Sequence, residues 1–313
     1  MGKIGIMFSG GGAQYPGMMR DLYDTIPECR AVFEKADEIV GYKLSDIIFN
    51  GTIEELSDTS VMIPAVFTSD VVSFIALKKY GVLPDIALGF SLGEWAAITA
   101  AGVIPFEIAL ELVQFRSDEM AKATPKNGAG MAVIMGKPNE YVENLCKRIK
   151  YGYVCPANYN YQGQITISGD KNGLDELEKL ALEEGIIYKR LPVNVPSHCP
   201  LMKNAMHALE KKLDDIVFKK PSFPIVSNCS AFPTDDPDQI KKNIIIQLIS
   251  PVLFEQSVHN LIKLNVDTFI ELGPGMTLYK FVKKITKNSP NILSLGHIDS
   301  VETLNETLRL FDK

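Results

Sequence analysis

The sequence predicts an α/β fold with a mainly parallel sheet, and two observations lead to that prediction. Short apolar runs such as "KIGIMF", "DIALGFS" and "VDTFIEL" end at glycine or serine turns and precede longer helical patterns. Strands that alternate with helices are typical of parallel sheets. In the middle of the chain the order becomes β-α-β-β-α-β, which is typical of a ferredoxin-like subdomain. We therefore expect a core domain of residues 1–126 and 197–313 and a small subdomain of residues 127–196.

In the first part of the core, the strand "KIGIMF" precedes a glycine-rich loop and the strand "DIALGFS" precedes a helix over residues 92–101. Apolar periodicity predicts further helices over residues 28–40, 61–80 and 106–122. The small subdomain is expected to contain the strands "GAGMAVIMG", "YVCPAN", "QITISG" and "IIYKRLPV", with the helices "NEYVENLCKRIK" and "DKNGLDELEKLALEEG". Helices over about 200–217, 238–249 and 276–286 and a closing helix then alternate with the strands "FPIVSN", "VDTFIEL" and "ILSLG".

Composition excludes several classes of protein. The chain has 313 residues, of which 46% are hydrophobic and 22% are charged, as in a soluble globular protein. Its formal net charge of −6 argues against a nucleic-acid binder. The five cysteines form no CxxC pair, so we expect reduced thiols and no metal site. The N-terminus has no secretory pattern, and we find no charge-free apolar run long enough to span a membrane. We expect a cytoplasmic monomer.

The stretch "GFSLG" has the G-x-S-x-G pattern between a predicted strand and a predicted helix. This arrangement is typical of a nucleophile elbow, in which a sharp turn exposes the serine hydroxyl. The N–H of Leu92, at the start of the following helix, could donate a hydrogen bond to an oxyanion. The alternative is a tight turn whose glycines serve the backbone alone.

A serine nucleophile needs a base, and the chain has four histidines. His207 lies between two lysines on a helix, which indicates a solvated face, and His259 and His297 are expected to be structural. His198 lies in "NVPSHCPLM", between two prolines and just before a helix, as loop residues of active sites often do. His198 is therefore the best candidate base for Ser91.

Arg116 lies on the apolar stripe of its helix, four residues after Leu112 and four before Met120. Because burying an unpaired guanidinium is costly, an anion should meet it. That anion is either an internal Asp or Glu, or the carboxylate of a substrate held by a bidentate contact.

Two glycine-rich turns follow predicted strands. The loop "FSGGGAQYPGM" lacks the lysine of a P-loop, and Tyr15 occupies the last glycine position of the dinucleotide pattern. It remains a candidate to bring backbone N–H groups to an oxyanion. The turn "ELGPGMTL" is expected to support the site.

Together, "FSGGGAQYPGM", "GFSLGEWAA", "QFRSDEM", "ANYNYQGQITISG", "VPSHCPLM", "QLISPVLFEQSV" and "ELGPGMTL" resemble the malonyl-CoA:acyl-carrier-protein transacylases, in order along the chain. The resemblance implies an α/β-hydrolase-like core. It implies that Ser91 is acylated, that His198 is its base and that Gln247 orients the histidine. It also implies that Arg116 holds the malonyl carboxylate, that Leu92 and Gly11 form the oxyanion hole, and that Asn158 and Asn160 lie near the acyl pocket.

The sequence departs from the family pattern at three positions. The family usually has glutamine where Gly11 stands, histidine where Phe90 stands, and glutamine where Ile63 stands. A main-chain oxyanion donor survives the change at Gly11. These departures put the acyl preference in question more than the reaction.

The expected reaction is transfer of a malonyl group from malonyl-CoA to the phosphopantetheine thiol of an acyl carrier protein through a seryl ester, with no resident cofactor. The alternatives are a serine thioesterase that clears acyl groups from carriers, an acyltransferase of polyketide synthesis with an altered acyl preference, and a non-catalytic docking module. Arg116 distinguishes the transferase, because a general hydrolase does not need it. Lys280, Lys283, Lys284 and Lys287 form either a basic strip for the acidic carrier or a solvated helix face.

Overall fold

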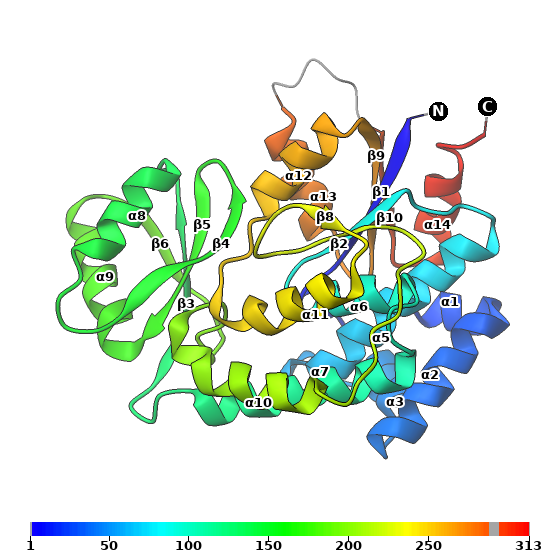
Figure 1. Cartoon of the computed structure of the whole chain (residues 1–313), viewed down its shortest axis with the longest axis horizontal. Helices are drawn as coiled ribbons and strands as arrows, with labels where there is room; N and C mark the ends of the chain where they lie inside the picture. The colour runs from blue at the N-terminus through cyan, green and yellow to red at the C-terminus, as the bar shows by residue number, and fades with distance from the viewer. Residues whose placement is uncertain (1, 288–293, 313) are drawn as a thin grey trace.

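The computed structural model describes residues 2–287 and 294–312, which form two β-sheets with helices around them (Figure 1). The larger sheet has six strands in the order β10-β9-β1-β2-β7-β8. These strands are β1 (Lys3–Phe8), β2 (Ile86–Gly89), β7 (Ile225–Val226), β8 (Pro233–Thr234), β9 (Val266–Leu272) and β10 (Ser294–Ile298). The strands from β10 to β7 pair in parallel, and β8 pairs antiparallel with β7. The predicted mainly parallel sheet is confirmed.

Helices of the core cover both faces of this sheet (Figure 1). They are α1 (Arg20–Thr25), α2 (Pro27–Val40), α3 (Leu44–Asn50), α4 (Ile53–Ser57), α5 (Thr59–Lys79), α6 (Gly93–Ala100), α7 (Phe106–Ala123), α10 (Lys203–Leu213), α11 (Pro237–Ile246), α12 (Phe254–Lys263), α13 (Thr277–Ile285) and α14 (Val301–Leu308). Two 3-10 turns, Pro200–Met202 and Gln247–Ile249, precede α10 and follow α11.

The predicted core helices are present, but four further helices were missed. Helices α1, α3 and α4 have six, seven and five residues, so each offers fewer than two full turns of periodicity. Helix α12 carries a clear apolar stripe of Phe254, Val258 and Leu261, a signal that was present in the sequence. The strand predicted at "FPIVSN" is only two residues long, and the first two residues of "ILSLG" lie outside the described residues.

Helix α5 is the central helix of the core. Its residues from Ile63 to Leu77 are almost all buried, including the polar residues Thr68, Ser69, Asp70 and Ser73. Within the described residues, α5 is the one helix long and apolar enough to cross a membrane, and 78% of its apolar window is buried inside the molecule. A core helix of a globular protein is also apolar all round and buried in this way.

The small subdomain contains the second sheet, drawn in green to one side of the core (Figure 1). Its elements are β3 (Ala129–Met135), α8 (Asn139–Lys147), β4 (Val154–Tyr161), β5 (Gln164–Asp170), α9 (Lys171–Glu183) and β6 (Ile187–Arg190). The strand order β4-β5-β3-β6, with every neighbouring pair antiparallel, confirms the ferredoxin-like arrangement. The division into residues 1–126 with 197–313 and residues 127–196 stays a prediction.

The carboxyl ends of the parallel strands meet at one edge of the larger sheet. Ser9 follows β1, Ser91 lies just after β2, Asn228 lies just after β7, and Gly273 follows β9. In open α/β sheets this edge is where ligands bind, because the loops after the strands converge there. The fold therefore gathers side chains that are far apart in the sequence.

Candidate active site

The turn after β2 has the geometry of a nucleophile elbow. Ser91 has a φ of 55°, in the left-handed region that non-glycine residues rarely adopt. A Cβ at Gly89 would lie 1.9 Å from the carbonyl carbon of Gly93, and a Cβ at Gly93 would lie 2.3 Å from the carbonyl oxygen of Phe8. Both glycines are therefore required by close backbone approach, and the turn presents the Ser91 hydroxyl at the start of α6.

His198 lies against this hydroxyl. The Oγ of Ser91 is 2.7 Å from Nε2 of His198, although the two residues are 107 positions apart in the chain. Nδ1 of His198 is 3.0 Å from the main-chain carbonyl oxygen of Gln247. A carbonyl oxygen only accepts, so Nδ1 carries the proton and Nε2 is free to accept one from Ser91.

Burial keeps this histidine neutral. His198 is 2% exposed, and its φ of 61° is left-handed like that of Ser91. Burial, with the nearby positive charge of Arg116, lowers the pKa of His198 to about 4. The ring is thus unprotonated at neutral pH and is ready to act as a base.

Arg116 is buried without a carboxylate partner. Its side chain projects from α7 and is 3% exposed. Within the described residues it forms no ion pair closer than 4 Å, and its Nε has no hydrogen-bond partner. Its Nη2 donates a 3.3 Å hydrogen bond to Oε1 of Gln247, and burial lowers its pKa to about 10. The internal ion pair considered from the sequence is absent from the described part of the chain, so the guanidinium keeps free donors for an anion.

Gln247 connects these groups. Its main chain contacts His198, while its side-chain Nε2 donates to the carbonyl oxygen of Ser91 at 3.0 Å and to Oε2 of Glu94 at 2.7 Å. The contact to the histidine therefore comes from the carbonyl group, and the amide of Gln247 links Arg116 with Glu94 instead.

Two functional residues were missed in the sequence. Asn228 accepts a 2.8 Å hydrogen bond from the N–H of Ser91 and donates one of 2.6 Å to the carbonyl oxygen of Gly89, so it fixes the elbow from β7. Glu94 is 2% exposed, and burial raises its pKa to about 7. The signals were an acid directly after the G-x-S-x-G pattern and an asparagine at the end of a strand.

Two backbone N–H groups near the Ser91 hydroxyl have no acceptor in the part of the chain that the structure describes. Neither the N–H of Leu92 nor that of Gly11 donates a hydrogen bond within the described residues. Leu92 is the N-cap of α6, where helical N–H groups are unsatisfied. The loop of Gly11 lies beside the elbow, since a Cβ at Gly10 would lie 2.9 Å from the carbonyl oxygen of Phe90.

The three departures from the family pattern gather around this loop. A Cβ at Gly11 would lie 3.5 Å from Cε of Met62 and 3.9 Å from Cδ1 of Ile63. The Phe90 ring lies beside Gly10, with 2.9 Å between its Cδ1 and the position of a Cβ there. The wall next to the glycine loop is therefore apolar.

Asn158 and Asn160 are both buried on β4 in the small subdomain. Nδ2 of Asn160 donates to Gln164 and Thr166 at 3.2 Å each, while Oδ1 of each asparagine has no partner within the described residues. Neither side chain contacts Ser91, His198 or Arg116 through a hydrogen bond in the described part of the chain. The other histidines do not join the site either: His207 and His259 are exposed on helices and His297 is buried in β10.

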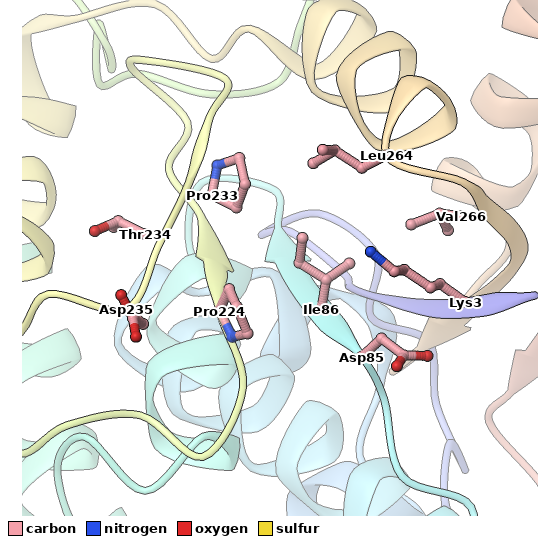
Figure 2. A pocket seen from close by; sticks show the side chains of 9 residues that line it. All are labelled: Lys3, Asp85, Ile86, Pro224, Pro233, Thr234, Asp235, Leu264 and Val266. Atoms are coloured by element: carbon pink, nitrogen blue, oxygen red, sulfur yellow. The ribbon is translucent and has the colours of Figure 1, made fainter.

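A surface pocket lies at the opposite edge of the larger sheet (Figure 2). Lys3, Ile86 and Val266, at the starts of β1, β2 and β9, line part of it. Because Ser91 and its partners lie beyond the carboxyl ends of these strands, this pocket is separate from the candidate active site.

Comparison with known proteins shows the family of this chain. The family model described as "Acyl transferase domain" matches residues 6–308. The chain belongs to this family. It is 37% identical to the malonyl CoA-acyl carrier protein transacylase of Bacillus subtilis (strain 168), over 99% of this chain and 98% of that protein.

Solved structures of acyl transferase family members are also similar. The malonyl CoA-acyl carrier protein transacylase of Clostridium perfringens has a TM-score of 0.92 and 34% identity, with 99% of this chain and 97% of that chain covered. A malonyl-transacylase in complex with its type II PKS acyl-carrier protein has a TM-score of 0.93 and 32% identity, with 98% of this chain and 99% of that chain covered. The predicted fold and family are thus confirmed.

Proposed function

We propose that this acyl transferase moves a malonyl group from malonyl-CoA to the phosphopantetheine thiol of an acyl carrier protein. The observation that carries the proposal is the buried guanidinium of Arg116, which has no carboxylate within 4 Å in the described residues. It is linked through Gln247 to the same site as the Ser91–His198 pair. A free carboxylate on the acyl group would satisfy this charge, and malonyl carries one where acetyl does not.

In the first half-reaction, Oγ of Ser91 attacks the thioester carbonyl carbon while Nε2 of His198 takes the hydroxyl proton. The developing oxyanion accepts hydrogen bonds from the N–H groups of Leu92 and Gly11. The carbon–sulfur bond then breaks, and coenzyme A leaves with the proton that His198 returns to its sulfur. The malonyl group remains as an ester on Ser91.

In the second half-reaction, His198 takes the proton of the carrier's phosphopantetheine thiol, and the sulfur attacks the ester carbonyl carbon. The bond to Oγ breaks, and Ser91 recovers its proton from His198. Arg116 holds the malonyl carboxylate throughout, so the carbonyl faces the thiol in a fixed orientation. The acyl group stays on the protein's own hydroxyl in this scheme, and we propose no resident cofactor.

Mass spectrometry of the intact protein tests the proposal. Exposure to malonyl-CoA alone should give a lasting malonyl adduct on Ser91, which holo acyl carrier protein then removes to become malonyl-carrier. Ser91→Ala should give no adduct. The hydrolase alternative expects free malonate at a comparable rate without any carrier. A mixture of acyl-CoA thioesters in the same assay tests whether the apolar wall of Met62, Ile63 and Phe90 changes the acyl preference.

For the carrier we propose the basic strip on and after α13 as a docking surface. Its lysines are all exposed: Lys280, Lys283, Lys284 and Lys287. Phe281 from the same helix packs 6.3 Å from the ring of Phe90, next to the nucleophile, so a carrier on this helix would be close to the site. The double variant Lys283→Glu/Lys284→Glu should raise KM for the carrier and leave adduct formation from malonyl-CoA unchanged. If KM for the carrier stays the same, the strip is a solvated face.

We also propose that the protein acts as a cytoplasmic monomer. All five cysteines are free, as expected in a reducing compartment. Size-exclusion chromatography with light scattering tests the oligomeric state, and a molar mass near 34.6 kDa is expected for a monomer.

A further inference from the structure

We propose that Ser9 and Asp70 form a positioning pair that holds the glycine loop after β1, and with it the N–H of Gly11, against the nucleophile. The inference rests on the proposed function, in which that N–H receives the oxyanion. Oγ of Ser9 donates a 2.7 Å hydrogen bond to Oδ1 of Asp70 on α5. Ser9 is 1% exposed and Asp70 is fully buried.

The pair lies directly behind the elbow. The main chain of Ser9 packs against the start of α6, since a Cβ at Gly93 would lie 2.4 Å from the carbonyl oxygen of Ser9. The N–H of Ser9 donates to the carbonyl oxygen of Leu272 at the end of β9. Ser9 is thus held at three points, and Gly11 follows two residues later.

Gly273 makes room for this pair. Its φ is 107°, and a Cβ there would lie 1.8 Å from Oδ1 of Asp70 and 2.6 Å from Oγ of Ser9. The turn "ELGPGMTL" therefore allows a carboxyl group and a hydroxyl to meet beneath the glycine loop. This gives a physical role to a motif that the catalytic residues alone leave unexplained.

Burial favours the neutral form of the Asp70 carboxyl group. Burial raises the pKa of its carboxyl group well above the ordinary range, and the nearby Glu271 adds to the same effect. A neutral group needs no counter-charge inside the core. An asparagine should therefore replace Asp70 in this role, because its Oδ1 also accepts from Ser9.

The far end of the loop has a second anchor. The hydroxyl of Tyr15 donates a 2.7 Å hydrogen bond to Oδ2 of Asp299, which follows β10. Between Ser9 and Tyr15 the loop contains Gly10, Gly11 and Gly12, whose backbones are the least restricted of any residue type. The side-chain hydrogen bonds of Ser9 and Tyr15 therefore hold both ends of the glycine segment in one position.

The test compares Ser9→Ala, Asp70→Ala and Asp70→Asn, with Ser69→Ala as the matched control. Ser69 is an equally buried residue of α5 whose hydroxyl has no partner within the described residues. Two rates are measured for each folded variant: single-turnover malonylation by malonyl-CoA, and labelling of Ser91 by a fluorophosphonate, which also places an oxygen in the oxyanion hole. Circular dichroism checks the fold, and Tyr15→Phe provides a milder variant at the other anchor.

Ser9→Ala and Asp70→Ala should slow both reactions by about tenfold or more, up to the roughly 10²–10³-fold that loss of an oxyanion donor costs. KM for malonyl-CoA should stay within about twofold, because the loop acts on the transition state. Asp70→Asn should recover most of the wild-type rate in both reactions. Tyr15→Phe should lose about half of the wild-type rate or more, and Ser69→Ala should react at the wild-type rate.

Rates of Ser9→Ala and Asp70→Ala that match the wild type would overturn the proposal. So would an effect on KM alone, or an Asp70→Asn variant as slow as Asp70→Ala. If the wild type reacts with the fluorophosphonate but not with malonyl-CoA, the proposed function fails, and the labelling rates still decide the positioning role. If Ser91 reacts with neither, both proposals are wrong.

Discussion

Nε2 of Gln247 donates a 2.7 Å hydrogen bond to the buried carboxyl group of Glu94. The same amide accepts from Arg116 through its oxygen, so Gln247 bridges a buried acid and a buried base that do not touch each other. Because its main-chain carbonyl also accepts a hydrogen bond from Nδ1 of His198, Gln247 contacts both the imidazole of His198 and the guanidinium of Arg116. Glu94 therefore holds the side-chain amide of Gln247 in place.

Removing this carboxyl group should destabilise the fold. Glu94→Ala leaves one N–H group of the Gln247 amide and the N–H of Asn228 without their buried acceptor. The expected loss is about 2–4 kcal/mol in the free energy of unfolding, since each orphaned buried donor costs about 1–3 kcal/mol. Urea denaturation measures it. Glu107→Ala, at an exposed position of α7, is the control and should stay within about 0.5 kcal/mol of the wild type.

The free energy of unfolding should depend on pH in a way that reflects the raised pKa of Glu94. Its pKa rises from 4.5 to about 7 on folding, so the folded state holds a proton that the unfolded state releases. The contribution of Glu94 to stability is therefore fully present below about pH 4.5 and is lost as the pH rises through about 7. Glu94→Gln should remove this loss. The free energies of unfolding of the wild type and of Glu94→Gln are compared at pH values from about 5 to about 8. As the pH rises, the wild type should lose stability relative to the variant. A difference that does not change with pH would contradict the raised pKa of Glu94.

Substrate selectivity should depend on Arg116. Arg116→Ala should lower kcat/KM for malonyl-CoA by about 100-fold or more, because the two charge-assisted hydrogen bonds that we propose to the carboxylate would be lost. Acetyl-CoA, which has no free carboxylate, serves as the control substrate and should lose far less. Stopped-flow acylation with each thioester makes the comparison. Equal losses with both substrates would show that Arg116 only supports the core.

Acylation should persist well below neutral pH. Burial lowers the pKa of His198 from 6.5 to about 4, so the base remains unprotonated as the pH falls through 6.5. The single-turnover rate should therefore stay level until the pH approaches about 4, provided that circular dichroism shows the protein still folded. An apparent pKa of about 6.5 or above for this step would contradict the lowered pKa of His198.

The glycines of the elbow should tolerate no side chain. Gly93→Ala would place a Cβ 2.3 Å from the carbonyl oxygen of Phe8, at the point where α6 begins against β1. We expect a loss of about 3 kcal/mol or more in unfolding free energy, because two backbones would have to separate. Gly11→Ala, whose Cβ would only reach ordinary contact with Met62, should keep its stability within about 0.5 kcal/mol. Thermal or urea unfolding of both variants makes the comparison.

By itself the sequence determined the elements and the most distinctive chemistry. Local apolar periodicity predicts the alternating strands and helices, because each element must bury one face. The pattern around Ser91 and the position of Arg116 on an apolar stripe are also local features. The short helices α1, α3 and α4 were not predicted, because helices of five to seven residues are too short to show a clear apolar periodicity.

Only the tertiary structure decided which of these groups meet. Ser91 and His198 are 107 residues apart. Local patterns made each of them a candidate, but their 2.7 Å contact depends on how the two segments pack. The parallel sheet brings the ends of β1, β2, β7 and β9 to one edge, and there Asn228 and Asp70 acquire partners that their own segments do not suggest. Local sequence sets the backbone preference of each element, whereas contacts between distant segments depend on how the whole chain packs, and the site consists of such contacts.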